Sequence, residues 1–278
     1  MKPKSLVKSM KDGSLSLGTY CTISSPELIE TMGYCGLNHV IIDHMFTAID
    51  WSTTANMIRA AQLYGVCPIV RVQTYGWASR GGDQHVASEV ARALGVGAGA
   101  AMVSIGSVDE LEMCLGVQKD QHHRRIWLSP DVETIESTGD DTDIKNPEDK
   151  FFVFPLIELP ELIDQVEKIC ALKHLSCISV GIHDICHGIG HPYDVEHPEV
   201  WKVLDRFMAA GKANGVDVWV NVGYRYKTVD EMVARIGRLY ERGFRTIQVQ
   251  GPNTLLQHMY GGVVRGSHAA RQGAAKGS

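Results

Sequence analysis

Short runs rich in β-branched residues alternate with longer amphipathic segments along most of the chain, and about eight such repeats can be counted. This alternation is typical of strand–helix units around a parallel sheet, and about eight units over about 250 residues predict a (β/α)8 barrel, a TIM barrel of the α/β class. The predicted strands are Leu15–Tyr20, His39–Asp43, Cys67–Val72, Ala100–Ser104, Phe151–Ile157, Cys177–Gly181, Asp217–Asn221 and Arg245–Val249.

Capping residues mark the segments between these strands as helices. Ser25 followed by Pro26 predicts the start of the first helix, which we expect to close near Gly33. A second helix is expected after Ser52 and should stop at Gly65, where a glycine can adopt the left-handed conformation. The same role is expected for three later glycines, Gly95, Gly215 and Gly243.

Two stretches interrupt the regular order of units. One is Thr74–Asp83, and the other is a polar excursion at about 116–150, with a short strand predicted at Ile126–Leu128. We expect one barrel domain over residues 1–264. Residues 265–278 are small, polar and rich in glycine, so a flexible tail is predicted there.

Composition limits both the location expected for the protein and the kind of partner that it binds. The chain is 44% hydrophobic and 21% charged, without the roughly 18-residue apolar run of a membrane span or the apolar core of a secretory signal, so we expect a cytoplasmic protein. A formal net charge of −5 without a basic stripe argues against nucleic acid as a partner. Seven cysteines without a CxxC pair favour reduced thiols. The expected ligand is a small molecule.

Polar residues end four of the predicted strands. They are Asp43 with His44, then Arg71, Glu158 and, slightly later, Asp184. Because the carboxyl ends of barrel strands meet at one rim, these side chains should converge there. Carboxylates at such a mouth suit a hard divalent cation such as Mg²⁺ or Mn²⁺, and an arginine beside them would stabilise charge on a substrate oxygen. The alternative for each residue is a structural ion pair at a strand end.

The order of several short motifs resembles one known family. Ile42-Asp43, Pro68–Arg71, Ile157-Glu158, Gly181-x-x-Asp184 and His197-Pro198-Glu199-Val200 occur in the order and at the spacing of the HpcH/HpaI aldolases, the 4-hydroxy-2-oxoheptanedioate aldolases. The resemblance extends from about Leu17 to Leu256, and each motif is weak, but the ordered set is fairly specific. It implies a barrel of the phosphoenolpyruvate/pyruvate-binding type.

The resemblance also implies a reaction and a site. A metal-dependent aldolase would cleave a 4-hydroxy-2-oxo acid to pyruvate, or a related 2-oxo acid, and an aldehyde. Glu158 and Asp184 match the metal-ligand positions, for which Mg²⁺ and Mn²⁺ are the first choices and Co²⁺ and Zn²⁺ stay open. Arg71 matches the arginine that contacts the keto oxygen, and substrate binding would involve Asp43, Gly181, Ile182 and His183. A homo-oligomer such as a hexamer is implied, with a C-terminal helix such as Asn253–Tyr260 packing on a neighbour.

Departures from the family pattern cluster at the catalytic base. Where the family reads Gly-Glu-His after the strand-two aspartate, this chain reads His44-Met45-Phe46, so Phe46 stands at the base histidine. The aspartate that family members pair with that histidine, from a neighbouring subunit, corresponds to Gly95. The joint loss indicates altered chemistry. His44 is a candidate relocated base, and its alternative is a histidine that bonds a neighbouring loop.

The histidines His183, His187 and His191 have a four-residue spacing that could place them on one helical face as a zinc site. Gly188 and Gly190 argue against a regular helix there, and the resemblance assigns this loop to anion binding.

Three functions stay open for the whole chain: an aldolase for 4-hydroxy-2-oxo acids, a metal-dependent decarboxylase of an oxaloacetate-like acid, and a non-catalytic barrel that binds a 2-oxo acid.

Overall fold

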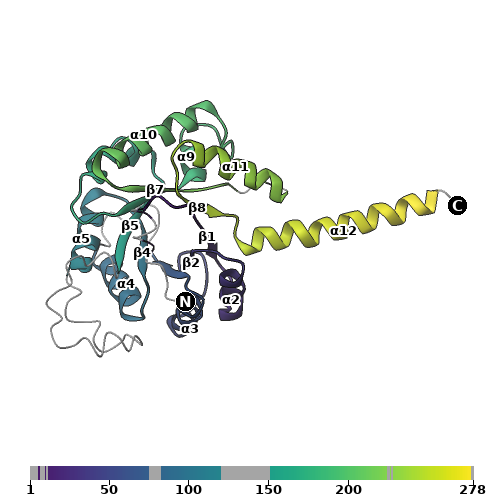
Figure 1. Cartoon of the computed structure of the whole chain (residues 1–278), viewed down its shortest axis with the longest axis horizontal. Helices are drawn as coiled ribbons and strands as arrows, with labels where there is room; N and C mark the ends of the chain where they lie inside the picture. The colour runs from purple at the N-terminus through teal and green to yellow at the C-terminus, as the bar shows by residue number, and fades with distance from the viewer. Residues whose placement is uncertain are drawn as a thin grey trace.

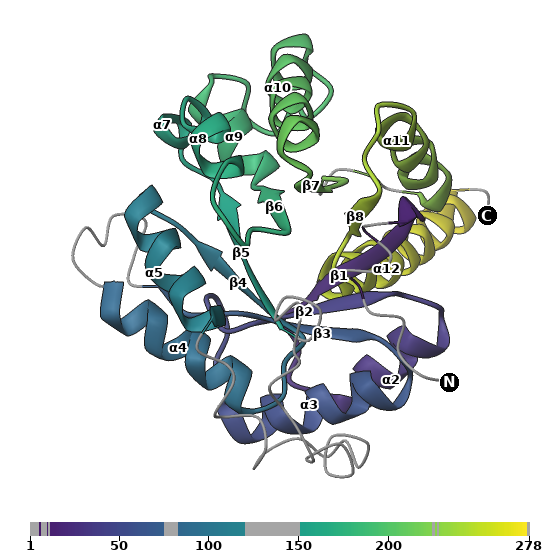
Figure 2. The same ribbon diagram turned by 60° about the vertical axis from the view of Figure 1, so that its left-hand side comes forward.

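Eight parallel strands close into a barrel in chain order. The computed structural model describes residues 6, 10, 12–74, 83–119, 151–223, 226 and 228–276. Figure 2 shows the helices around the outside of the strands, as expected for a (β/α)8 barrel. The strands are β1 (Ser16–Cys21), β2 (His39–Asp43), β3 (Cys67–Arg71), β4 (Ala100–Ser104), β5 (Phe152–Ile157), β6 (Cys177–Val180), β7 (Asp217–Asn221) and β8 (Thr246–Val249).

The helices follow the strands along the chain. The described helices are α2 (Pro26–Tyr34), α3 (Trp51–Leu63), α4 (Asp83–Gly95), α5 (Val108–Lys119), α7 (Pro160–Ile163), α8 (Val166–Cys170), α9 (Ile182–Gly188), α10 (Pro198–Asn214), α11 (Val229–Glu241) and α12 (Pro252–Lys276). α5 runs to Lys119, and residues 120–150 of the excursion predicted at about 116–150 lie outside the described residues. The short strand predicted at Ile126–Leu128 lies outside the described residues.

The predicted strands agree with the observed strands to within one residue at each end. Strands of a parallel barrel are covered on both faces, so they appear in the sequence as continuous apolar runs bounded by polar or glycine residues. β2 and β5, for example, are buried at every position. The barrel prediction is confirmed.

One of the two predicted helix starts is where the sequence places it, and the other lies earlier in the chain. The Ser25 hydroxyl accepts a hydrogen bond from the backbone N–H of Leu28 at 3.1 Å, which starts α2 as predicted. The start of α3 differs, because the Asp50 carboxylate accepts from the N–H of Thr53 at 2.9 Å and the helix begins at Trp51, before Ser52. An aspartate side chain is as good a cap as a serine hydroxyl, and this one lies earlier in the chain.

Left-handed glycines close several helices. Gly65, Gly215 and Gly243 have φ angles of +72°, +70° and +102°, as the sequence predicts. Helix α4 does end at Gly95, but the left-handed conformation predicted for Gly95 is wrong, because Gly97, with φ +92°, takes the left-handed turn. A second glycine close by makes this turn possible two residues later.

The interior of the barrel is filled by large apolar side chains. Phe152, Phe154 and Trp219 pack together there, and Leu6 from the N-terminal segment belongs to the same cluster. A second, larger apolar cluster fills the space between the strands and the surrounding helices. The barrel is therefore a packed core, and its polar chemistry is confined to its ends.

Helix α12 leaves the barrel and runs outward to the C-terminus (Figure 1). It extends to Lys276, so residues 265–276, where a flexible tail is predicted, continue the helix. Residues with good helix propensity, such as Arg265 and Gln272, separate the glycines of this segment. Within the described residues, no helix combines the length and hydropathy needed to cross a membrane, α12 included.

Candidate active site at the carboxyl end of the barrel

The predicted site residues come from neighbouring strands at one end of the barrel. Asp43 is the last residue of β2 and is paired in register with Arg71, the last residue of β3. Glu158 directly follows β5, and Asp184 lies in the first turn of α9, just after β6. Parallel strands bring all these positions to the carboxyl end of the barrel, where the active sites of such barrels lie.

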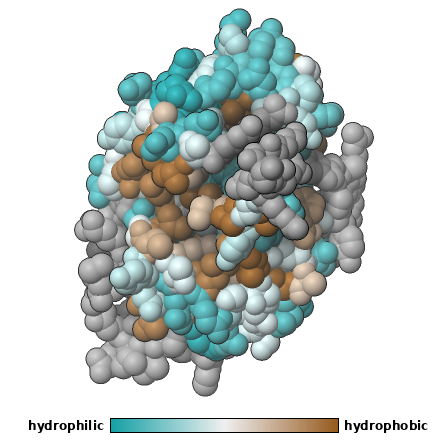
Figure 3. All heavy atoms as spheres, turned by 90° about the vertical axis from the view of Figure 1, so that its right-hand side faces the viewer, coloured by the Kyte–Doolittle hydropathy of each residue, from teal (hydrophilic) through white to brown (hydrophobic). Residues whose placement is uncertain are grey.

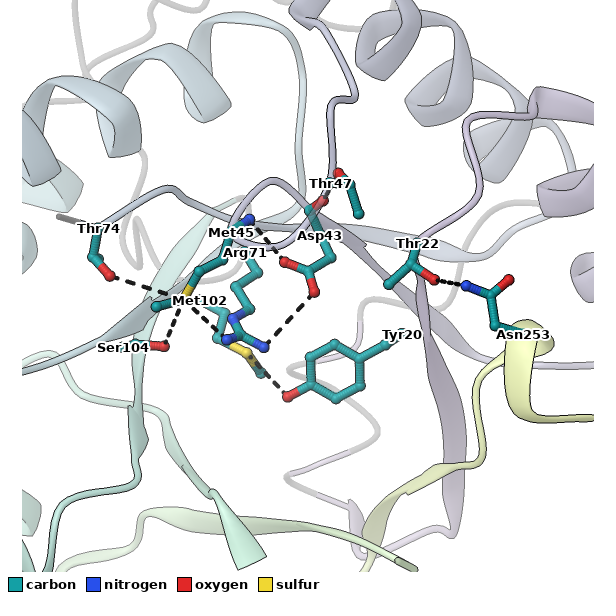
Figure 4. A network of polar contacts seen from close by, with 10 residues as sticks. All are labelled: Tyr20, Thr22, Asp43, Met45, Thr47, Arg71, Thr74, Met102, Ser104 and Asn253. Atoms are coloured by element: carbon teal, nitrogen blue, oxygen red, sulfur yellow. Dashed lines mark hydrogen bonds and ion pairs between the residues drawn. The ribbon is translucent and has the colours of Figure 1, made fainter. Parts of the chain in front are cut away.

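Arg71 is the centre of the cluster. Its Nη1 lies 3.8 Å from Asp43 Oδ2, and both side chains are buried. Its Nη2 lies 2.9 Å from the Sδ of Met45, and its guanidinium carbon is 4.8 Å from the centroid of the Phe46 ring. Figure 4 shows Asp43 and Met45 on either side of the guanidinium, with the Tyr20 ring close by. A carboxylate, a thioether and aromatic rings thus hold this cation at the mouth.

Glu158 is buried, and its pKa is raised to about 7. Burial is the main cause, and the nearby carboxylates of Asp184 and Asp43 raise the pKa further. The Arg71 guanidinium and a hydrogen bond from Ser104 act in the opposite direction. Asp184 therefore lies close enough to Glu158 to raise its pKa, and the Arg71 guanidinium acts to lower the pKa of both carboxyls.

The pKa of Asp184 is also raised. Burial is again the main cause, whereas the Arg71 guanidinium and the Asp184 backbone N–H act to lower it. Without a cation, both carboxyls are thus disfavoured in their charged form. Two convergent carboxylates with this property are the oxygen donors that a hard divalent cation uses, and its charge would reverse both shifts. The residues present therefore fit a divalent metal.

Gly181 makes room for the Glu158 side chain. A Cβ atom at this position would lie 2.3 Å from Glu158 Cγ and 3.1 Å from the carbonyl oxygen of Ile157. Any other residue would push the carboxylate away from its place. Gly181 also precedes the first turn of α9, where the Ile182 side chain is buried in the core and His183 is half-buried. Ile182 can therefore contact a ligand only through its backbone.

His44 is held against α3, in the helix layer outside the strands. Its Nε2 lies 2.6 Å from the Thr54 hydroxyl oxygen, and its ring is 4.4 Å from the ring of Trp51, centroid to centroid. Burial lowers the pKa of the imidazole. The structure thus groups Asp43, Arg71, Glu158 and Asp184, whereas the His44 ring is engaged elsewhere.

Sequence reasoning missed three residues of the site: Tyr20, Met45 and Ser104. Met45 Sδ also lies 3.6 Å from the Ser104 hydroxyl and 3.9 Å from the Thr74 hydroxyl (Figure 4). Ser104 is the last residue of a correctly predicted strand, so the rule that identified Arg71 would have found it too. No sequence signal shows that Met45 points inward, because it lies in a loop.

The alternative of a zinc site at His183, His187 and His191, which the sequence argued against, is not formed. His183 and His187 do lie on a helix, because α9 runs to Gly188 despite the glycines of this segment. The helix ends before His191. Within the described residues, the group with metal-binding geometry instead combines His191 with His197 and Glu199.

Comparisons with known proteins agree on one family. A family model described as HpcH/HpaI aldolase/citrate lyase matches residues 16–252. A 5-keto-4-deoxy-D-glucarate aldolase from Shigella boydii serotype 18 is 23% identical over 221 residues, which cover 77% of this chain and 81% of that protein.

Solved structures with the same fold include an HpcH/HpaI aldolase from Desulfitobacterium hafniense DCB-2. It has a TM-score of 0.75 and 18% identity, and the match covers 94% of this chain and 95% of that one. CitE from Mycobacterium tuberculosis, in complex with magnesium and acetoacetate, has a TM-score of 0.54 and 14% identity, with 87% of each chain covered. With a family model matched across nearly the whole barrel, this chain belongs to the HpcH/HpaI aldolase/citrate lyase family, a family of lyases.

Proposed function

We propose that this protein is a divalent-metal-dependent carbon–carbon lyase that acts on a 2-oxo acid. The observation that carries the proposal is the pair Glu158 and Asp184 at the barrel mouth, two carboxyls whose pKa values are raised by burial although the Arg71 guanidinium acts to lower both. A bound divalent cation would stabilise both carboxyls in their charged form.

Each residue of the site has a distinct role in this proposal. Glu158 and Asp184 hold the metal, which when bound supplies Lewis-acid stabilisation of negative charge on substrate oxygens. Arg71 donates hydrogen bonds to the oxo oxygen as charge develops there, and Asp43 orients the guanidinium. The backbone of Gly181, Ile182 and His183 receives the substrate carboxylate.

Mg²⁺ or Mn²⁺ is the proposed metal, because the protein donors are oxygens only. The magnesium in the complex of CitE from Mycobacterium tuberculosis supports this choice. Co²⁺ and Zn²⁺ remain alternatives that a metal titration would distinguish.

Two reactions fit such a site. Aldol cleavage of a 4-hydroxy-2-oxo acid to a 2-oxo acid and an aldehyde is supported by the name of the curated relative, an aldolase for a keto-deoxy sugar acid. Decarboxylation of an oxaloacetate-like acid needs no base to remove a hydroxyl proton. His44, the candidate relocated base, is engaged by its contacts with Thr54 and Trp51. These contacts favour the second reaction, which does not need this base.

The test is the release of pyruvate in a coupled assay with Mg²⁺ or Mn²⁺. Substrates are several 4-hydroxy-2-oxo acids and oxaloacetate, with Glu158→Gln and His44→Gln as variants and Glu161→Gln, an exposed glutamate three residues away, as control. Metal-dependent release from a hydroxy-oxo acid, lost in both variants, would establish an aldolase with His44 as base. Release from oxaloacetate alone, retained in His44→Gln, would establish the decarboxylase.

The same assay includes a result against the proposal. If no substrate released pyruvate but pyruvate stabilised the protein in a metal-dependent way, the protein would be a non-catalytic barrel that binds a 2-oxo acid. If Glu158→Gln released as much pyruvate as wild type, Glu158 would not be a metal ligand.

We also propose that the protein is a homo-oligomer, such as a hexamer, in which α12 packs on a neighbour. Apolar side chains of α12 are exposed, among them Met259, Tyr260, Val263 and Val264. Figure 3 faces the side toward which α12 projects, and hydrophobic residues gather on this side. Exposed apolar area of this kind is typical of an interface between subunits. A cytoplasmic location remains a prediction from the sequence.

A further inference from the structure

Three potential metal ligands meet where the chain passes from α9 to α10. The Nε2 of His191 lies 2.7 Å from a carboxylate oxygen of Glu199. The rings of His191 and His197 are stacked, with centroids 3.4 Å apart and planes inclined by 18°. Each of the three residues offers a ligand atom, and these atoms all lie within 4.8 Å of one another.

The backbone around these residues is fixed by contacts that do not involve the three ligand groups. The N–H of His191 donates to the carbonyl of Cys186 at 2.8 Å, which ties the segment to α9. Glu196, close to His197 in the chain, forms ion pairs with Arg235 at 3.1 Å and Arg238 at 2.6 Å, both on α11. The segment is therefore held at both ends, and an ion entering here would not have to order a free loop.

The donor set differs from that of the active site. Two imidazoles and a carboxylate are the ligands that zinc-class cations prefer, whereas Mg²⁺ and Mn²⁺ favour sites built of oxygen. Ligand atoms of a tetrahedral zinc site lie about 3–4 Å apart, since each is about 2 Å from the metal. The 2.7 Å between His191 Nε2 and the Glu199 oxygen and the 4.8 Å limit for the whole set bracket this range, so small side-chain adjustments would bring the three atoms to one ion. Both imidazoles are half-buried and Glu199 is exposed, which would leave a fourth position open to water.

We propose that His191, His197 and Glu199 form a second metal site, specific for a zinc-class divalent cation such as Zn²⁺, Co²⁺ or Ni²⁺. The ion replaces the hydrogen bond between His191 and Glu199 and links the segment after α9 to the first turn of α10. Because α9 carries Asp184 in its first turn, the ion also restrains the element that presents an active-site carboxylate.

Binding has one local cost. The Nδ1 of His197 accepts a hydrogen bond from the N–H of Glu199 at 3.2 Å and so caps α10. The ring must turn partly out of the stack to direct a lone pair at the ion, which weakens this cap. The helix start keeps Pro198 at its first position, where the fixed φ of proline suits a helix.

The experiment is a titration with Co²⁺, followed by its visible absorption, in a Glu158→Gln background that removes the proposed active-site metal. We expect about one equivalent to bind with the strong visible bands of a four- or five-coordinate ion with nitrogen ligands. His191→Ala should weaken binding by at least 10-fold. The matched control is His268→Ala, which removes an exposed histidine of α12.

A second variant guards against loss of the fold. His197→Asn removes an imidazole but keeps a side chain that caps helices well, so α10 should be retained in circular dichroism while Co²⁺ binding falls. Binding that survives His191→Ala and His197→Asn would overturn the proposal, as would absence of any Co²⁺ binding in the Glu158→Gln background. Because that background lacks the active-site metal, the result does not depend on whether the proposed lyase activity is found.

Discussion

The guanidinium of Arg71 lies over the ring of Phe46, 4.8 Å from its centroid. Phe46 occupies the position at which the resemblance to HpcH/HpaI aldolases places the base histidine. The aromatic face stabilises a cation that is always charged, but it accepts no proton. The Met45 thioether lies 2.9 Å from Arg71 Nη2, so Phe46 and Met45 make one side of the site apolar. Asp43 remains a charged partner of Arg71.

A histidine at position 46 should supply the general base that the family has at this position. Phe46→His places an imidazole beside Arg71, and we expect pyruvate release from 4-hydroxy-2-oxo acids to rise by at least 10-fold, since a positioned general base contributes about 100-fold or more. Phe46 is 62% exposed, so the fold should tolerate the change. Phe46→Leu is the control, and release should not rise in it. An equal rise in both variants would show that removing the aromatic ring, not adding a base, changes the activity.

Gly181→Ala should damage the metal site without removing a ligand. The added Cβ would lie 2.3 Å from Glu158 Cγ, so the carboxylate must move. We expect Mn²⁺ affinity to fall by at least about 10-fold, as for the loss of groups that orient metal ligands. Gly116→Ala, in α5 with open space around the new Cβ, is the control and should bind Mn²⁺ normally. Unchanged affinity in Gly181→Ala would mean that Glu158 is not a ligand.

The metal-free protein should lose stability as the pH rises through the range in which Glu158 titrates. Its folded-state pKa of about 7 lies above the ordinary value of 4.5, so between these values the unfolded chain has released a proton that the folded protein keeps. Stability therefore falls across this window and stays lower above pH 7, by on the order of 3 kcal/mol.

Thermal unfolding in EDTA measures this effect. Glu158→Gln removes the titrating group, so the variant should unfold at a temperature roughly 5 °C above wild type at pH 8 and close to wild type at pH 5. The exposed control Glu161→Gln should follow wild type at both values. A lower unfolding temperature for Glu158→Gln at pH 8 would show that burial does not destabilise the charged carboxylate.

The oligomer should depend on the apolar face of α12. Met259→Glu places a charge at a 70% exposed apolar position, and we expect a smaller species in size-exclusion chromatography with light scattering. Gln257→Glu adds the same charge at an exposed polar position of the same helix and should not change the mass. A monomeric wild-type protein would disprove the oligomer, and an unchanged mass in Met259→Glu would place the interface elsewhere.

Most of the fold could be read from the sequence. Strands buried on both faces, such as β2 and β5, appear as apolar runs, and caps such as Ser25 identify helix starts. The continuation of α12 could not be predicted from core patterns, because this segment has no apolar face that requires a partner within the chain. Helix propensity alone accounts for it.

The site residues that lie at strand ends could be predicted from the sequence. Asp43, Arg71 and Glu158 were expected to converge because parallel strands end at one rim, and the structure brings them together. The direction of side chains in the loop after β2 was not predictable, since strand alternation does not extend into a loop. His44 therefore contacts Thr54 on α3, whereas Met45 and Phe46 face Arg71.

A metal site formed by Glu158 and Asp184 is tested most directly by calorimetric titration of Mn²⁺ and pyruvate into wild type, Glu158→Gln and Glu161→Gln. We expect wild type and Glu161→Gln to bind Mn²⁺, pyruvate to bind only when Mn²⁺ is present, and Glu158→Gln to bind neither. Pyruvate binding of equal strength in EDTA, or Mn²⁺ binding that Glu158→Gln leaves unchanged, would contradict a metal site formed by Glu158 and Asp184.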